Sequence, residues 1–330
     1  MAIPENTQNK QIYTNFDLEN DIVSDVATRV TYGLWSNNVG TLTTFFTSST
    51  QPVTATGVGK YYHDVYSTAT SASAQVEFSI AYGHVADSGS LLGDRDKPAQ
   101  AIYDQYRNLL LSTKNAKFTL GTGGTLDHAL FISINRSNLK QKLDGGNWQL
   151  NLVSGSTTTT LVDDSGDSSD SDPTLVGDVL NIVSGTIGGT TGSTNYGLCY
   201  TKYGILVLDP DTIPVTINTG SDGYKDNSGK LYDSIKSGAS FQARSEEKIS
   251  STHYFCRVKN KQYNYSDNIT FYSGSNGALI YPSFNNDPHT FITTIGLYNN
   301  NNDLLAIGKL TKPVEKTFGN EALFKIKLDF

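Results

Sequence analysis

Cysteine, methionine and tryptophan are scarce in this chain. Its 330 residues include two cysteines, one methionine and two tryptophans. Cys199 and Cys256 lie far apart, without a CxxC spacing and without a histidine ligand set beside them. Two such cysteines build no disulfide framework and no structural zinc site. We therefore predict a reduced, buried pair.

Charged residues are also scarce, and acidic residues outnumber basic ones. Charged residues make up 17% of the chain, the formal net charge is −7 and the isoelectric point is about 5.2. Because such a chain has no general basic field to attract phosphates, we expect no nucleic-acid partner. Aspartate far outnumbers glutamate and suits turns and caps, which favours β structure. The glutamates are Glu5, Glu19, Glu77, Glu246, Glu247, Glu315 and Glu321.

Long apolar runs are missing from the sequence as well. The stretch MAIPENTQNK lacks the apolar core of a secretion signal. No stretch approaches the roughly 20 apolar residues that a membrane helix needs. We expect synthesis and folding in a cytoplasm, with no membrane partner.

Thr, Ser, Asn, Gly and Tyr are abundant, a composition typical of strands joined by turns. Apolar and polar residues alternate from Val76 to Tyr82, which predicts a strand with one buried face. We predict a mainly β fold of antiparallel sheets or sandwiches. Asp96 as a cap and Pro98 in the first turn predict a helix at about residues 97–112, and a second short helix is expected at 230–237.

Composition divides the chain into three regions. Residues 1–153 form an N-terminal β-rich region with the first helix, 154–220 a Ser/Thr/Gly/Asp-rich β insertion, and 221–330 a C-terminal antiparallel β region. Hairpin turns are expected at 202–204 and at the asparagine-rich 299–303, because asparagine tolerates left-handed backbone angles.

The last eleven residues, NEALFKIKLDF, alternate as a strand does. Phe324, Ile326, Leu328 and Phe330 fall on one face. We predict that Phe324, Ile326 and Leu328 are buried and that this strand completes the sheet begun at TFITTIGLY. We also predict that deleting Ile326–Phe330 gives insoluble protein.

An acidic cluster is one candidate for cation binding. The stretch DDSGDSSDSDP contains Asp163, Asp164, Asp167, Asp170 and Asp172. Closely spaced carboxylates could hold calcium, but the glycine and terminal glutamate of an EF-hand loop are missing, which favours a solvated loop. The glycine runs GTGGT and GTIGGTTG do not fit a phosphate-binding loop, and flexible turns explain them.

The histidines give no catalytic or metal signature. They are His63, His84, His128, His253 and His289. No two of them have the spacing of metal ligands on one element, so we predict no metal site. His63 and Asp64 could be half of a nucleophilic triad, but no G-x-S-x-G elbow accompanies them, and a structural or surface role is favoured.

Glu246 and Glu247 are the first place to look for the acids of a glycosidase. Adjacent residues on a strand point to opposite sides and cannot both flank one bond. A solvated pair, or a cap beside Arg244, is favoured. We assign no catalytic residue and expect no enzyme activity and no cofactor.

The stretch RVKNKQYNY mixes basic and aromatic residues: Arg257, Lys259, Lys261, Tyr263 and Tyr265. Such a mixture could bind single-stranded nucleic acid by stacking. Three basic residues in an acidic chain are a weak signal, so an interface or a solvated strand face is favoured.

Several stretches resemble a family of virion structural proteins from contractile-tailed bacteriophages, especially the large myoviruses that infect cyanobacteria and other marine bacteria. These stretches are YYHDVYST, AQVEFSIAYGHVADSGS, AIYDQYRNLLL, FQARSEEKISSTHYFCRVKNKQYNYSDN, TFITTIGLYNNNNDLLAIGKLTKPVEKTF and EALFKIKLDF. The match is continuous from Phe241 onward, patchy in the first half and loose over 154–195. The resemblance implies a virion component of the tail or baseplate, assembled in the host cytoplasm without a cofactor, and it carries no catalytic residues.

The expected function is that of a non-enzymatic structural subunit. Its expected partners are other virion proteins in multiple symmetric copies, and the 19 tyrosines and 14 phenylalanines suit subunit contacts. One alternative is a host-receptor or glycan-binding tail protein, which would expose aromatic platforms, with Trp35 and Trp148 the available tryptophans. A neck or head-surface position is the second alternative.

Overall fold

The computed structural model divides the chain into two compact units. Unit 1 combines Met1–Thr28 with Ile249–Phe330, and unit 2 is Arg29–Lys248. The expected regions 1–153, 154–220 and 221–330 do not coincide with these units, because the expected insertion supplies five strands to the main sheet of unit 2. The structure describes residues 21–24, 28–47, 62–69, 74–86, 98–111, 113, 115–121, 124–165, 172–174, 177–215, 217, 227–266, 268–273 and 278–329.

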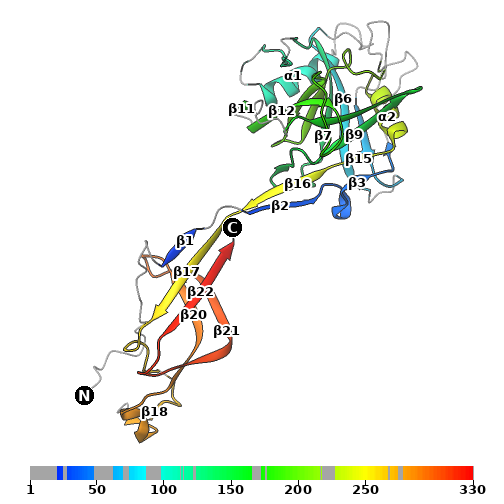
Figure 1. The fold of residues 1–330 in the computed structure, drawn as a ribbon. Coiled ribbons are helices and arrows are strands. Elements are labelled where there is room, and N and C mark those ends of the chain that lie inside the picture. Colours follow the sequence, from blue (N-terminus) through cyan, green and yellow to red (C-terminus); the bar gives the residue numbers. More distant parts are fainter. Residues whose placement is uncertain are drawn as a thin grey trace. The chain divides into compact units, whose positions relative to one another are not determined.

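The predicted mainly β fold of antiparallel sheets with two helices is confirmed (Figure 1). The elements from residue 28 to residue 249 are β2 (Thr28–Gly33), η1 (Ser36–Asn38), β3 (Thr41–Leu42), β4 (Phe46–Thr47), β5 (Tyr62–Tyr66), β6 (Val76–His84), α1 (Pro98–Leu110), β7 (His128–Ile134), β8 (Lys142–Leu143), β9 (Gln149–Ser154), β10 (Thr157–Asp163), β11 (Asp172–Thr174), β12 (Gly177–Ser184), β13 (Gly197–Tyr200), β14 (Ile205–Leu208), α2 (Asn227–Gly238), β15 (Phe241–Gln242) and β16 (Arg244–Ile249). The elements of unit 1 are β1 (Ile22–Ser24), β17 (Ser251–Val258), β18 (Tyr272–Ser273), β19 (Ala278–Leu279), η2 (Pro282–Asn285), β20 (Thr290–Tyr298), β21 (Leu304–Lys316) and β22 (Ala322–Asp329).

One large antiparallel sheet dominates unit 2 and curls on itself. Its strand order is β3-β15-β9-β10-β12-β13-β14-β7-β6-β5-β4, with β11 paired to β12. Phe241 in β15 and Phe78 in β6 stand seven positions apart in this order. On a flat sheet they would lie about 34 Å apart. Their ring centroids are 5.5 Å apart, and the Trp35 ring lies near both. The sheet therefore wraps around a shared apolar core.

The two helices occupy opposite faces of this sheet. Leu231 and Ile235 of α2 belong to the core that the sheet encloses, where α2 contacts β9, β6 and β5. Tyr103 of α1 packs with Phe131 in a second apolar cluster on the other face. The helices predicted at about 97–112 and 230–237 are thus confirmed. Among the described residues, no helix is long and apolar enough to span a bilayer.

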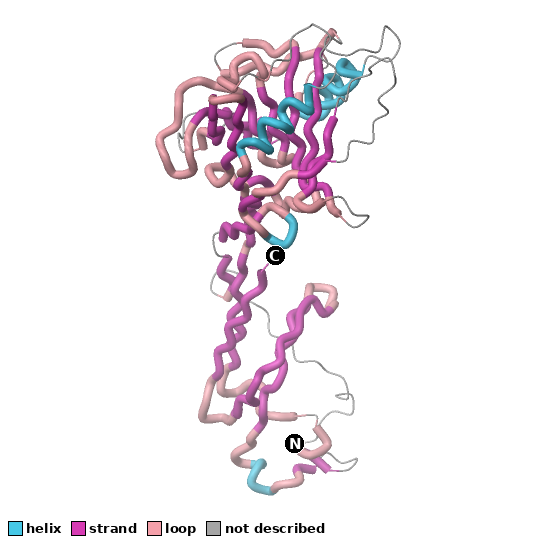
Figure 2. Tube along the Cα trace, turned by 90° about the vertical axis from the view of Figure 1, so that its right-hand side faces the viewer, coloured by secondary structure: helices cyan, strands magenta, loops and turns pink. Residues whose placement is uncertain are grey.

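Unit 1 consists of small open sheets. β17 pairs antiparallel with β1 and, over its full length, with β22. β20 and β21 form a separate hairpin, and the magenta tubes of Figure 2 show paired strands that twist around each other. The hairpin turns at Asn299, whose side-chain oxygen accepts the N–H groups of Asn301 and Asp303. The turns predicted at 299–303 and 202–204 are both confirmed.

The predicted place of the last strand is wrong. β22 is hydrogen-bonded to β17 and lies in a different sheet from β20, which begins the TFITTIGLY stretch. Phe324, Ile326 and Leu328 share one face as predicted, but they are half-buried, because the three-stranded sheet has too little material around that face to bury them.

Candidate functional site

The described part of the acidic cluster is committed to internal hydrogen bonds. Asp163 accepts the backbone N–H of Gly146 at 2.9 Å and that of Ser165 at 3.0 Å. Asp164 accepts the backbone N–H and the side-chain amide of Asn181 at 2.9 and 2.8 Å. Both side chains are buried rather than solvated, and burial raises the pKa of the Asp164 carboxyl. The remaining members lie outside the residues whose side chains are described: Asp167, Asp170 and Asp172.

His63 is a packing residue and does not pair with Asp64. Its ring is buried, lies 2.9 Å from the Ser228 hydroxyl through Nδ1, and stacks on Tyr232 of α2. Asp64 instead accepts a hydrogen bond from Ser79 on the neighbouring strand. The contact with α2 supports the structural role favoured from the sequence.

Glu246 is buried, which corrects the prediction of a solvated pair. Its carboxylate lies 3.2 Å from Arg29 Nε and 4.0 Å from Lys142 Nζ. Arg29 also pairs with Asp144, a fully buried carboxylate. Glu247 is half-buried. This ion network joins β2, β16 and β8, the strands of one small sheet, and accounts for Glu246 as a structural residue.

Both cysteines are free. Cys199 is buried as predicted, and burial raises the pKa of its thiol well above the usual range. Cys256 is half-buried rather than buried, because it lies in the thin sheet of unit 1. Burial likewise raises the pKa of the Cys256 thiol, so neither thiol is an activated nucleophile.

The two tryptophans are core residues. Trp35 and Trp148 are 2% and 1% exposed, and the Trp35 indole donates to the Phe241 carbonyl. Neither can serve as an exposed sugar-binding platform. A pocket of about 370 Å³ lies beside Trp35, with a polar lining that includes Tyr32 and Lys140, whose Nζ lies 5.4 Å from the Tyr32 ring centroid.

The basic and aromatic side chains of RVKNKQYNY differ in their surroundings. Arg257, Lys259 and Lys261 are exposed. Tyr265 instead packs on Phe271 and Tyr272, within an aromatic cluster that continues through Phe284 to Tyr281 and His289. Tyr265 is therefore not a separate stacking platform next to the basic residues.

Apolar side chains are distributed very unevenly between the two units. Of the 49 buried apolar residues in the described chain, three belong to unit 1: Val258, Phe271 and Leu297. Of the 15 large apolar side chains that are exposed, 12 belong to unit 1: Val23, Tyr265, Ile269, Ile280, Tyr281, Phe291, Leu304, Leu305, Ile307, Val314, Phe318 and Leu323. Unit 1 has half as many residues as unit 2. It therefore exposes apolar surface that an isolated domain would normally bury.

The β20–β21 hairpin concentrates this surface. Leu305 is 68% exposed, Ile307 61% and Phe291 61%. Among the described residues, β20 and β21 pair only with each other, so each has an unpaired edge. A two-stranded hairpin alone is marginally stable, and open edges with apolar side chains are where another chain adds. Among the described residues, the hairpin is the strongest candidate for an interface.

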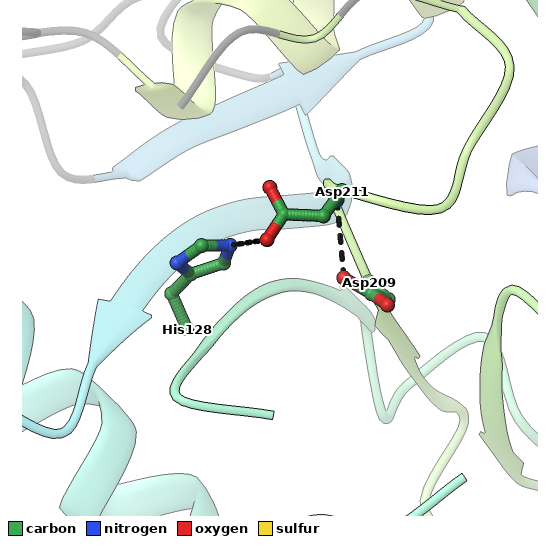
Figure 3. Close-up of side chains that lie close together, drawn as sticks. All are labelled: His128, Asp209 and Asp211. Atoms are coloured by element: carbon green, nitrogen blue, oxygen red, sulfur yellow. Dashed lines mark hydrogen bonds and ion pairs between the residues drawn. The ribbon is translucent and has the colours of Figure 1, made fainter. Parts of the chain in front are cut away.

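A second candidate site lies in unit 2, where β7 begins beside the end of the adjacent strand β14. His128 begins β7, Asp209 directly follows β14, and Asp211 lies two residues further on. His128 Nε2 is 3.0 Å from a carboxylate oxygen of Asp211, and Asp209 accepts the Asp211 N–H at 3.0 Å (Figure 3). One ligand atom from each of the three residues lies within 4.8 Å of the others. The sheet thus assembles a cluster that histidine spacing alone did not reveal.

The surroundings of this cluster are aromatic and ionisable. The His84 ring, opposite His128 on β6, has its centroid 5.8 Å from the His128 ring. Burial, reinforced by Asp211, raises the pKa of the Tyr82 phenol. Next to His128 in sequence, Asp127 pairs with Lys117, and this hydrogen bond lowers the pKa of the Asp127 carboxyl.

A scan against protein-family models, a search of curated proteins and a search of solved structures each gave no match to the chain.

Proposed function

We propose that this chain is a non-enzymatic structural subunit of a contractile-tailed phage virion, in the tail or baseplate, that acts through contacts with other virion subunits. The observation that carries the proposal is the exposed apolar surface of unit 1. The resemblance of its sequence, continuous from Phe241 onward, covers most of the same unit. The partner is a neighbouring virion subunit that offers apolar side chains and a strand edge to the β20–β21 hairpin.

The difference between the cores of the two units supports this role. Unit 2 encloses its own core, so its folding does not require a partner. Unit 1 has little core, and association with a neighbour would supply the missing burial and stabilise the folded form. A subunit of this kind is anchored by one unit and carries a stable second unit into the particle.

The position of the chain in a particle tests the proposal. Mass spectrometry of purified virions from a phage that encodes the chain should detect it at a fixed stoichiometry. A cryo-EM reconstruction should place the β20–β21 hairpin against another subunit of the tail or baseplate. A chain that is missing from purified virions, or one whose hairpin faces solvent there, contradicts the proposal.

Variants test the surface itself. Leu305→Lys and Ile307→Lys add charge where the side chains already face solvent, so the isolated chain should fold as before while incorporation into particles is lost. Leu109→Lys is the matched control, because Leu109 is 45% exposed but lies on α1 in unit 2. If all three variants were incorporated equally, the hairpin would not be part of the interface.

The polar pocket beside Trp35 favours a second candidate, a receptor- or glycan-binding tail protein. Lys140 and the side chains of Asn37, Asn38 and Gln75 could hydrogen-bond a sugar next to Tyr32. Glycan-array binding that Tyr32→Ala abolishes would support this candidate, and a distal position in the particle would agree with it.

A further inference from the structure

We propose that His128, Asp209 and Asp211 bind one divalent transition-metal ion, of the class of Zn²⁺ or Mn²⁺, at the end of the main sheet of unit 2. The proposal is independent of the virion role. It rests on the convergence of one imidazole nitrogen and two carboxylates from two adjacent strands, β7 and β14.

The sheet topology presents the three side chains at one place. β7 and β14 are antiparallel neighbours, so β7 begins where β14 ends. His128 is the first residue of β7, and Asp209 is the first residue after β14. The Asp209 carboxylate accepts the Asp211 N–H, which holds the chain after β14 in a turn and brings the Asp211 carboxylate to His128 Nε2 (Figure 3). The strand pairing and this turn therefore bring the three residues to one place.

The distances suit a single ion. Ligand atoms about 2.0–2.2 Å from zinc lie roughly 3–4.4 Å apart. His128 Nε2 and the nearer Asp211 oxygen are 3.0 Å apart, and the widest separation in the set is no more than 4.8 Å. The Asp211 side chain is 72% exposed, whereas that of Asp209 is buried.

The charges also suit a divalent ion. Two carboxylates and a neutral imidazole carry a formal charge of −2, which a divalent cation balances. An imidazole nitrogen beside carboxylates favours zinc or manganese over calcium, which prefers an all-oxygen shell. Because three protein ligands leave a coordination position for water, a group from another molecule could replace that water and bind the ion.

His289 provides an internal contrast. It too lies between two carboxylates, but Glu315 is on its Nδ1 and Asp287 on its Nε2, at 2.5 and 3.3 Å. Carboxylates on opposite ring nitrogens cannot share an ion with that ring. At His128 the Asp211 carboxylate and Asp209 gather near the same nitrogen. His289 is therefore a matched control for non-specific histidine binding.

The experiment uses the full chain, stripped with EDTA and titrated with ZnCl₂, MnCl₂ or CaCl₂ by calorimetry. We expect one saturable Zn²⁺ or Mn²⁺ site per chain and a rise in the melting temperature of unit 2 of roughly 5–10 °C at about 100-fold excess over Kd. Co²⁺ in the site should give visible bands typical of nitrogen and oxygen ligands.

Four variants separate the site from the background. Asp211→Asn and His128→Gln should lose the calorimetric site and the thermal shift, whereas Asp127→Asn and His289→Gln should keep both. Because the Asp211 side chain is largely exposed, Asp211→Asn should fold normally, which circular dichroism checks. Absence of saturable binding, a preference for Ca²⁺, or binding that survives both Asp211→Asn and His128→Gln would overturn the proposal.

Discussion

Glu77 is the buried carboxylate that organises one end of unit 2, and its removal should be costly. Its side chain is fully buried on β6. One oxygen accepts the Ser67 hydroxyl at 2.8 Å, and the other accepts the Ser36 N–H at 3.1 Å and the Asn138 amide at 2.9 Å. Glu77 thereby holds two segments that line the pocket beside Trp35.

The structure sets the size of the effect. In Glu77→Ala the Ser67 hydroxyl can turn to water, but the Ser36 N–H and the Asn138 amide lose their acceptor. A hydrogen bond to a charged group contributes about 1.5–3 kcal/mol, so two such bonds predict a loss of about 3–6 kcal/mol in the free energy of unfolding. Glu77→Gln keeps an oxygen toward both donors and turns its amide to Ser67, which can accept. Its predicted loss is about 1–2 kcal/mol.

Urea denaturation followed by tryptophan fluorescence measures both variants, because Trp35 and Trp148 are buried in unit 2. The dependence of the free energy on urea should be unchanged, since the surface exposed on unfolding is the same. A loss below about 1 kcal/mol for Glu77→Ala would refute the reasoning, because it would mean that water replaces the carboxylate. Equal losses for the two variants would show that shape, not hydrogen bonding, decides stability.

Three further predictions concern packing, pH and strand pairing. In Gly83→Ala the new Cβ would lie 2.8 Å from the Tyr103 backbone nitrogen, so α1 must shift. We expect the free energy of unfolding, measured by urea denaturation, to fall by about 1–3 kcal/mol. Gly124→Ala is the control, because its new Cβ has no atom within 4 Å, and it should lose less than half of that. Burial raises the pKa of the Tyr82 and Tyr200 phenols, so the folded state keeps protons that the unfolded chain releases above pH ~10. Stability should therefore be fully present below that pH and fall as the pH rises further, which urea denaturation at several pH values measures. A free energy of unfolding that does not fall above pH ~10 would contradict this. Deleting Ile326–Phe330 removes the partners of the first half of β17 and should give insoluble protein, a prediction that recovery of soluble truncated chain would contradict.

Much of the secondary structure follows from local sequence patterns. The helix at Pro98–Leu110 and the turn at 299–303 were predictable, because helical spacing, proline in a first turn and asparagine in a turn act within a few residues. The alternation in NEALFKIKLDF predicted a strand, but its partner is β17, about 70 residues earlier. Alternation shows which side chains share a face, but it does not determine which strand pairs with this one.

The candidate sites depend on longer-range pairing. Glu246 looked solvated in sequence because its partner Arg29 lies more than 200 residues away. The exposed apolar side chains of β21 follow an ordinary strand pattern, and only the absence of a described third strand beside the hairpin makes them a candidate interface.

By itself the sequence determined that the chain is mainly β, where its helices and tight turns lie, and that it is poor in cysteine and basic charge, because these properties depend on composition and on neighbours in the chain. Tertiary structure alone decided that β7 and β14 are adjacent and antiparallel. That pairing brings His128 to Asp209 and Asp211 across 81 residues of chain, a contact that no local pattern encodes.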